Sequence, residues 1–221
     1  MDRHFHEELK QFKGKLIQMG DLVVCAIENA VKALLNRDQK LASQVIEEET
    51  KINQREIEID EEGHKLSTLG QPMASDMRLI TSILKINTDL ERLGDHAVNI
   101  AERTFLLLEE PRFENLVKLP EMASVTLQML KDALSALKNE DVELARSVLS
   151  RDDEVDNFND DLYFKFEELM EKDPSITRIG MNLVMVGHNL ERIADLSNNI
   201  AENVIYLKQG KEVRHRIAVQ P

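Results

Sequence analysis

The sequence is poor in the residues that build turns and aromatic cores. Its 221 residues include only 8 glycines, 5 prolines and 4% aromatic side chains. A fold of many short strands needs far more turn residues, which argues against an all-β sandwich or barrel. Long apolar runs are also absent, since the longest covers residues 22–27, and the start lacks the apolar segment of a signal peptide. We therefore expect a cytoplasmic chain that does not itself span a membrane.

Basic residues and cysteines are scarce as well. The 28 lysines and arginines are outnumbered by 41 acidic residues, which gives a net charge of −13. Such a surface repels the phosphate backbone of DNA or RNA, so we expect no direct nucleic-acid binding. The single cysteine, Cys25, cannot form an internal disulfide, and its apolar neighbours indicate a small core residue.

The chain is rich in helical periodicity. Apolar residues recur every three or four positions over long segments, and four of the five prolines fall between these segments. Several methionines are interpreted as core residues, with an interaction surface made by some of them as the alternative; they include Met73, Met77, Met122, Met129, Met181 and Met185. The pattern predicts an all-α fold of six long helices, over 4–36, 39–69, 75–109, 118–138, 140–170 and 175–208.

The six segments form two copies of one three-helix unit. The motif LERLGDHAVNIAE at 90–102 matches LERIADLSNNIAE at 190–202 with an offset of 100, and residues 30–42 match 133–145 with an offset of 103. Each copy is long enough to bury a core of its own. We predict two tandem three-helix bundles, over 1–112 and 113–208, followed by a mobile tail over 209–221.

Each copy carries an oxygen-rich stripe on its third helix. Glu91, Asp95 and Asn99 follow one another at four-residue spacing, within about 80° of arc on one side of a helix. A carboxylate four residues from another costs a helix roughly 0.2–0.5 kcal/mol. Because both copies keep the pair, a cation is expected to compensate the repulsion. The stripe of the second copy consists of Glu191, Asp195 and Asn199.

A second polar pair lies one helix earlier in each copy. Glu49 and Asn53 of the first copy align with Asp152 and Asp156 of the second, again at four-residue spacing. If consecutive helices pack antiparallel, the two stripes of each copy face each other and offer four or five oxygen ligands. Such ligands suit Mg, Ca, Mn or Fe, and less typically Zn. The alternative is that these side chains are ordinary solvated surface charges.

The doubled motif, together with the segment QPMASDMR at 71–78, resembles the PhoU family of phosphate-transport regulatory proteins. The resemblance covers nearly the whole chain. Asn53 stands where that family usually has Asp, and Leu196 stands where His often follows the Asp. The resemblance implies two three-helix bundles whose Glu/Asp-x-x-x-Asp motifs bind metal ions or small metal clusters, with the ligands Glu49, Glu91, Asp95, Asp152, Asp156, Glu191 and Asp195.

The resemblance also implies a function. Proteins of this family are cytoplasmic, non-enzymatic regulators that link the ATPase subunit of a phosphate ABC transporter to a sensor histidine kinase and repress phosphate-starvation genes. Our leading hypothesis is therefore a metal-stiffened regulatory adaptor in two-component signalling. We expect it to be a homodimer that associates with the membrane only through its partners.

Two other functions stay open from the residues alone. The same carboxylates could serve a metalloenzyme, although the sequence has no phosphate-binding loop, no dinucleotide-binding motif and no nucleophile elbow. An enzyme would also need an open coordination position and a poised acid or base beside the metal. The other alternative is a structural scaffold that binds no metal.

Overall fold

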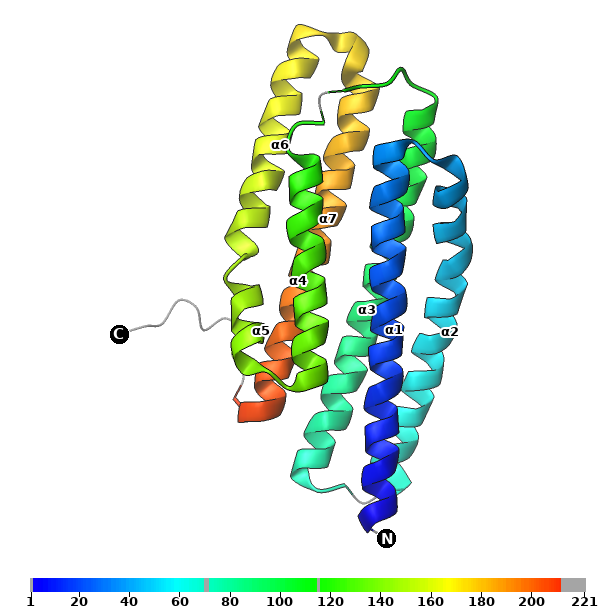
Figure 1. Cartoon of the computed structure of the whole chain (residues 1–221), viewed down its shortest axis with the longest axis vertical. Helices are drawn as coiled ribbons and strands as arrows, with labels where there is room; N and C mark the ends of the chain where they lie inside the picture. Colours follow the sequence, from blue (N-terminus) through cyan, green and yellow to red (C-terminus); the bar gives the residue numbers. More distant parts are fainter. Residues whose placement is uncertain (1, 70–71, 115, 212–221) are drawn as a thin grey trace, which may run out of the picture.

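The structure is a computed structural model that describes residues 2–69, 72–114 and 116–211. Within these residues it consists of helices and their connections, with no strand, which confirms the all-α class. Figure 1 shows the elements, which are α1 (Asp2–Asn36), α2 (Gln39–Leu69), α3 (Ala74–Leu108), α4 (Leu119–Asn139), α5 (Val142–Leu149), α6 (Asp152–Lys172), the short 3-10 helix η1 (Pro174–Ile176) and α7 (Thr177–Gln209).

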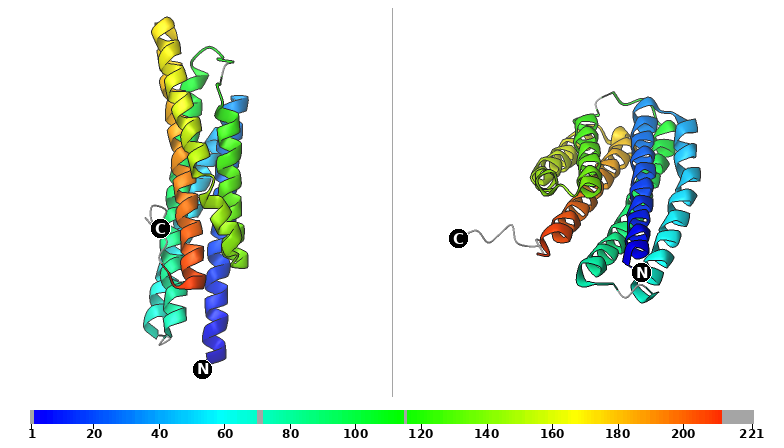
Figure 2. Two further views of the ribbon diagram at one scale, coloured as in Figure 1. Left: turned by 90° about the vertical axis from the view of Figure 1, so that its left-hand side faces the viewer. Right: turned by 60° about the horizontal axis from the view of Figure 1, so that its bottom comes forward.

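Two three-helix bundles lie side by side (Figure 2). The first contains α1, α2 and α3, and the second contains α4, α7 and the pair α5 and α6, which together take the place of one long helix. Consecutive long helices are antiparallel. The third helix of the first bundle, α3, also packs antiparallel against its counterpart α7 (Figure 1). The sequence repeat is therefore a structural repeat, as predicted.

The hydrophobic core is continuous from one bundle to the other. On α1, for example, Phe12, Leu16, Met19, Val23 and Ile27 are fully buried at spacings of three or four residues, which is one face of a helix. Each such side chain contributes roughly 1.5–3 kcal/mol when it leaves water. Because α3 and α7 both carry buried apolar faces, the two bundles share one packed interior.

The long helix expected over 140–170 is interrupted between α5 and α6. In a continuous helix the Ser147 carbonyl would accept the Arg151 amide. Instead that carbonyl accepts hydrogen bonds from Ser150 Oγ at 2.9 Å and Arg151 Nε at 3.2 Å. The Arg151 amide donates to the Val148 carbonyl at 3.0 Å. Side chains that compete for backbone groups thus end one helix, and three acidic residues form the first turn of the next.

Some apolar side chains lie outside the core. Cys25 is exposed, so the interpretation of this cysteine as a core residue was wrong. Its neighbours Ala26 and Ile27 are buried, and a turn of about 100° per residue carries the thiol to the solvent side of α1. The methionines divide in the same way. Met122 and Met129 are buried as expected, whereas the methionines that were wrongly assigned to the core are Met73, Met181 and Met185.

Two further features concern the ends and the length of the helices. No helix in the described ranges has an apolar stretch long enough to cross a bilayer. The last helix, α7, ends where Gly210 adopts the left-handed conformation with φ 63°, which glycine tolerates without a Cβ clash. The tail was expected to begin at residue 209, and residues 212–221 of it lie outside the described part of the chain.

Candidate functional site

The two polar stripes of the first bundle face each other across α2 and α3. Burial, followed by the charges of Asp95 and Glu56, raises the pKa of the Glu91 carboxyl, and Glu49 adds to the effect. Burial and the charge of Glu49 likewise raise the pKa of Asp95. Glu49 on α2 is therefore close enough to repel both acids on α3. The repulsion, together with the burial, disfavours ionisation of Glu91 and Asp95 unless a cation is present.

Asn53 lies within this first cluster and orders it. Its Nδ2 donates a hydrogen bond to Glu49 Oε1 at 2.6 Å. Its Oδ1 is buried and accepts no hydrogen bond from any described group. A buried oxygen without a donor costs roughly 1–3 kcal/mol. A bound cation would satisfy that oxygen, so the amide suits a ligand position even though it lacks a charge.

The second bundle has the same arrangement with more charge. Burial raises the pKa of Asp152, and the charge of Asp195 on α7 raises it further, while a hydrogen bond from Asn198 opposes the shift. Burial raises the pKa of Asp156 as well, and Asp152, Glu191 and Asp195 follow in that order as causes. The stripes on α6 and α7 therefore face each other as those on α2 and α3 do.

Two buried oxygens in the second cluster also lack donors among the described residues. Asn198 Nδ2 donates to Asp152 Oδ1 at 2.5 Å, which leaves Asn198 Oδ1 buried and without a hydrogen bond. Glu191 Oε2 is also buried and accepts no hydrogen bond from the described residues, although His188 Nδ1 lies 3.1 Å from it. Both bundles thus present unsatisfied oxygen atoms beside mutually repelling carboxylates.

A groove of about 600 Å³ between the two bundles joins the two clusters. Its floor is the packing of α3 against α7, held by a contact of 2.9 Å between His96 Nδ1 and Asn189 Oδ1. Arg192 donates from Nη1 to Asp195 Oδ2 at 2.9 Å and lies along the same groove as Arg92. Of the residues predicted as ligands, those that line this groove are Asp95, Asn99, Asp152, Asp195 and Asn199.

Sequence reasoning missed several residues of the groove. Arg92 and Arg192 follow the first glutamate of each motif at the same offset, a signal that was visible in the repeat. The repeat did not identify Asn198 as a groove residue, because Val98 occupies its place in the first copy. Its partner Asp152 lies on another helix, so only the packing of α6 on α7 brings the two together.

The clusters suit a hard cation by the type of their donors. All ten predicted ligand residues offer carboxylate or amide oxygens, which bind Mg, Ca, Mn or Fe and, less typically, Zn. In the side-chain positions of the described residues, however, no group of three His, Cys, Asp or Glu side chains is arranged to hold a metal ion. The metal site therefore stays a prediction.

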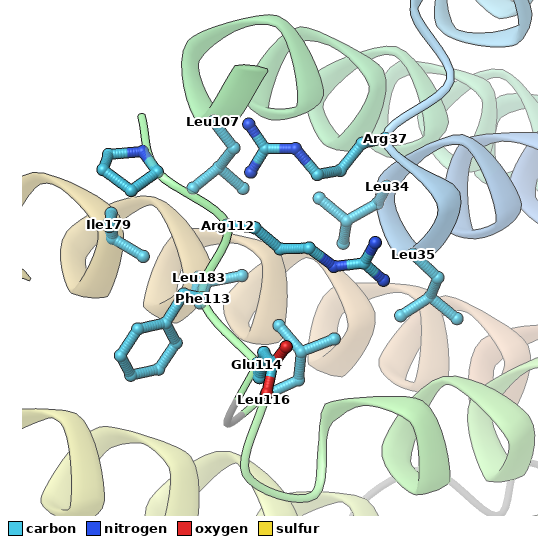
Figure 3. Close-up of a pocket in the computed structure, with 11 residues that line it drawn as sticks. Leu34, Leu35, Arg37, Leu107, Arg112, Phe113, Glu114, Leu116, Ile179 and Leu183 are labelled. Carbon is cyan, nitrogen blue, oxygen red and sulfur yellow. The ribbon is translucent and has the colours of Figure 1, made fainter. Parts of the chain in front are cut away.

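A smaller cavity of about 240 Å³ lies beneath the connection between the bundles (Figure 3). Most of its lining is apolar, and it comes from the ends of α1 and α3, the connection itself and the start of α7. Arg37 donates to the backbone carbonyls of Leu108 at 3.2 Å and Glu110 at 2.7 Å, which ties the turn after α1 to the end of α3. None of the predicted ligands lines this cavity, and Arg37 fastens the connection to the first bundle.

Comparison with known proteins supports this architecture for both copies of the repeat. A family model described as the PhoU domain matches the chain twice, over residues 16–104 and 119–204. The first match contains α2 and most of α3 with the first cluster. The second match contains α6 and most of α7 with the second cluster. Each polar cluster therefore lies inside one copy of the matched domain.

Full-length relatives and solved structures agree with the family model. A phosphate-specific transport system accessory protein PhoU homolog of Pseudomonas aeruginosa is 40% identical, and the alignment covers 97% of this chain and 89% of that protein. The corresponding homolog of Aquifex aeolicus is 37% identical, with 95% of each chain covered. 

The crystal structure of PhoU from Pseudomonas aeruginosa superposes with a TM-score of 0.91 at 39% identity, covering 94% of this chain and 100% of that one. The PhoU structure from Streptococcus pneumoniae superposes with a TM-score of 0.87 at 32% identity, covering 95% of this chain and 99% of that one. With two domain matches, relatives aligned over nearly their whole length and the same arrangement of helices, this chain belongs to the PhoU family.

Proposed function

We propose that this chain regulates phosphate uptake and phosphate-starvation signalling as a metal-binding adaptor. The observation that carries the proposal is the pair of opposed carboxylate clusters, one in each copy of a domain whose relatives are named as accessory proteins of phosphate-specific transport. Accessory proteins act through partners, and the chain presents an extended helical surface for them. The adaptor binds the ATPase subunit of a phosphate ABC transporter and a sensor histidine kinase, and it lowers the starvation response.

The metal ions stiffen the two bundles in this proposal. In the first bundle Glu49 and Asn53 hold a cation from α2, while Glu91, Asp95 and Asn99 hold it from α3. A cation between two helices replaces a repulsion by an attraction, which fastens α2 to α3. The equivalent ligands that fasten α6 to α7 in the second bundle are Asp152, Asp156, Glu191, Asp195 and Asn199.

The adaptor does no catalysis in this proposal. The groove between the clusters contains Arg92 and Arg192, and Arg192 is paired with Asp195. The relatives of the chain are named as accessory proteins of transport. The chain acts as a homodimer in the cytoplasm and reaches the membrane through the transporter.

Metal content and thermal stability test the first part of the proposal. The purified chain should contain metal by elemental analysis, and anomalous diffraction should place it at both clusters. Removal by a chelator should lower the melting temperature and leave the helical circular dichroism largely intact, because packing supplies most helical stability. The metal-binding part of the proposal would be supported if metal is lost from the double variants Glu91→Gln/Asp95→Asn and Glu191→Gln/Asp195→Asn. The control Glu47→Gln should retain its metal. A metal-free native protein would contradict this part of the proposal.

A reporter strain tests the regulatory part. In a strain that lacks its own protein of this family, the wild-type chain should repress a phosphate-starvation promoter when phosphate is plentiful. The two double variants should lose repression, and Glu47→Gln, which changes an exposed acid on α2, should keep it. Direct binding to the isolated ATPase subunit and to the kinase gives the physical readout. Repression without binding to either partner would refute the adaptor role.

A further inference from the structure

The second bundle exposes large apolar side chains on α6 and α7. Tyr163 and Phe164 of α6 are 53% and 64% exposed, and their rings meet edge to face with centroids 5.7 Å apart. Met181 and Met185 of α7 are 53% and 37% exposed. We call these four residues the aromatic–methionine patch. An open hollow of about 320 Å³ beside Phe164 adds a concave edge to it.

The helix register places the two parts of the patch at one level of the bundle. Leu162 of α6 lies directly against Gly187 of α7, since a Cβ on that glycine would come within 2.3 Å of Leu162 Cδ2. The helices are antiparallel (Figure 1). Phe164 therefore lies at about the level of Met185, on the neighbouring helix. The exposed aromatic and methionine side chains therefore lie on neighbouring helices along the same stretch of the bundle.

The first bundle shows that the fold does not need this patch. Its α2 and α3 occupy the places of α6 and α7 in the same three-helix architecture. If folding required large apolar residues at these positions, both copies would have them. The residues at the same offsets of 103 and 100 in the first copy are all polar, namely Asp60, Glu61, Thr81 and Lys85.

The charge around the patch indicates the chemistry of its partner. Next to the patch, residues 160–172 of α6 contain five acidic and two basic residues, a net charge of −3, and the other acids of α6 include the proposed metal ligands Asp152 and Asp156. Such a surface repels anionic lipid headgroups, nucleic acid and a second acidic copy of this chain. It attracts lysine and arginine side chains, which also bind favourably over exposed aromatic rings.

We propose that the aromatic–methionine patch binds a basic amphipathic helix of a partner protein. The apolar face of that helix covers Tyr163, Phe164 and the two methionines, whose flexible thioethers adapt to it. The basic face meets the acids of α6. The inference rests on the proposed adaptor function and adds to it the surface by which the second bundle holds one partner.

Substitution by the first copy's own residues tests the patch. The variant Tyr163→Asp/Phe164→Glu/Met181→Thr/Met185→Lys places residues that the same architecture already tolerates, and circular dichroism checks that it folds. Its matched control is Ile57→Asp, which removes an exposed apolar residue from α2 and installs the residue type that Asp160 provides in the second copy. The probe is a synthetic peptide of about 18 residues, five turns of helix, with leucine on one face and lysine on the other.

Binding of the peptide should shift the methyl NMR signals of Met181 and Met185 and leave those of the buried Met122 and Met129 in place. The four-residue variant should raise the dissociation constant of the peptide at least about tenfold, equivalent to about 1.4 kcal/mol. Ile57→Asp should leave the dissociation constant unchanged. Raising the salt concentration should weaken binding to the wild type. A peptide with glutamate in place of lysine should not bind.

Three outcomes would overturn the inference. The first is an unaltered affinity in the four-residue variant. The second is concentration-dependent self-association that this variant abolishes, which would make the patch an interface between copies of the chain. The third is patch-dependent binding to vesicles containing anionic lipid. The adaptor function is judged separately: if the four-residue variant loses the peptide but keeps the ATPase subunit and the kinase, the inference fails and the proposed function stands.

Discussion

His96 Nδ1 lies 2.9 Å from Asn189 Oδ1, and this contact joins α3 of the first bundle to α7 of the second. The Asn189 amide is oriented by its Nδ2, which donates to the Met185 carbonyl at 2.7 Å. Its oxygen therefore faces the imidazole, so His96 must carry a proton on Nδ1 and donate it. A second contact lies seven residues further along α3, where Arg103 Nη1 donates to Asn182 Oδ1 at 3.4 Å. Asn182 precedes Asn189 by seven residues on α7. The antiparallel packing of the bundles is thus fastened by polar contacts at two levels.

The contact between His96 and Asn189 should contribute to stability. Asn189→Ala leaves the His96 N–H without its acceptor in a half-buried position, and we expect a loss of about 1 kcal/mol of unfolding free energy. A double-mutant cycle with His96→Ala, followed by urea denaturation, should give a coupling energy of about 0.5–1.5 kcal/mol. Strict additivity of the two single variants would show that the contact carries no energy.

If both proposed metal sites bind a cation, the site in the second bundle should bind it more tightly than the site in the first. The aligned ligands differ in charge at one place, where Asp156 corresponds to Asn53, and an additional anion strengthens attraction to a hard cation. In a site-resolved titration with Mn²⁺, Asp156→Asn should weaken the second site about tenfold, or about 1.4 kcal/mol. Asn53→Asp should strengthen the first. Equal affinities in the wild type, or no response to either change, would show that these two residues are not ligands.

In the metal-free protein, Asn53→Asp should lower the free energy of unfolding, although the same change should strengthen metal binding. The change removes the hydrogen bond of 2.6 Å to Glu49 and adds a charge to a cluster in which the pKa values of Glu91 and Asp95 are already raised. We expect the chelated variant to lose about 1–2 kcal/mol of unfolding free energy. Added Mn²⁺ should restore the melting temperature of the variant more than that of the wild type. A variant that is equally stable with and without chelator would contradict this reversal.

Two glycines should respond to alanine with opposite signs. At Gly187 a Cβ would come within 2.3 Å of Leu162 Cδ2 and 3.2 Å of Asn159 Oδ1, so the buried Leu162 side chain would have to leave its present position. We expect Gly187→Ala to destabilise the protein by about 1–3 kcal/mol. Gly14 lies in α1 with nothing within 4 Å of its ideal Cβ, so Gly14→Ala should stabilise it by up to about 1 kcal/mol. Thermal unfolding of both variants provides the comparison.

The ion pairs of Glu140 should make stability depend on pH. Hydrogen bonds from Lys208 at 2.7 Å and Lys13 at 2.9 Å lower the pKa of this carboxyl and link the end of α4 to α7 and α1. A lowered folded-state pKa means that the stabilisation is present above the unfolded value, ordinarily 4.5, and is lost as the pH falls through the folded value. Glu140→Gln should therefore destabilise the protein by about 0.5–1 kcal/mol at neutral pH, a modest effect because the pair is partly solvated.

The difference in unfolding free energy between Glu140→Gln and the wild type should shrink as the pH is lowered below the ordinary pKa of a glutamate carboxyl. Urea denaturation across this range measures it. About 1 M salt, where the Debye length is about 3 Å, should shrink the difference at neutral pH as well. A difference that is constant with pH would mean that Glu140 acts through its left-handed backbone conformation, φ 55°, and not through its charge.

Much of the architecture followed from the sequence by itself. Apolar spacing of three and four residues determines the helices, because each helix buries one face whatever it packs against. The repeat of LERLGDHAVNIAE as LERIADLSNNIAE determines that there are two bundles. The four-residue spacing of Glu91 and Asp95 determines a carboxylate stripe, since that spacing places both side chains on one side of a helix.

Only the tertiary structure decided what lies between the bundles. The packing of α3 against α7 brings Asp95 and Asp195 to one groove, and side chains a hundred residues apart leave no local pattern that predicts such a crossing. The interruption after α5 depends on side chains that compete for one carbonyl at Ser147. The exposure of Met181 and Met185 is a property of which helix faces remain uncovered, and a methionine fits an apolar stripe equally well on either side of that boundary.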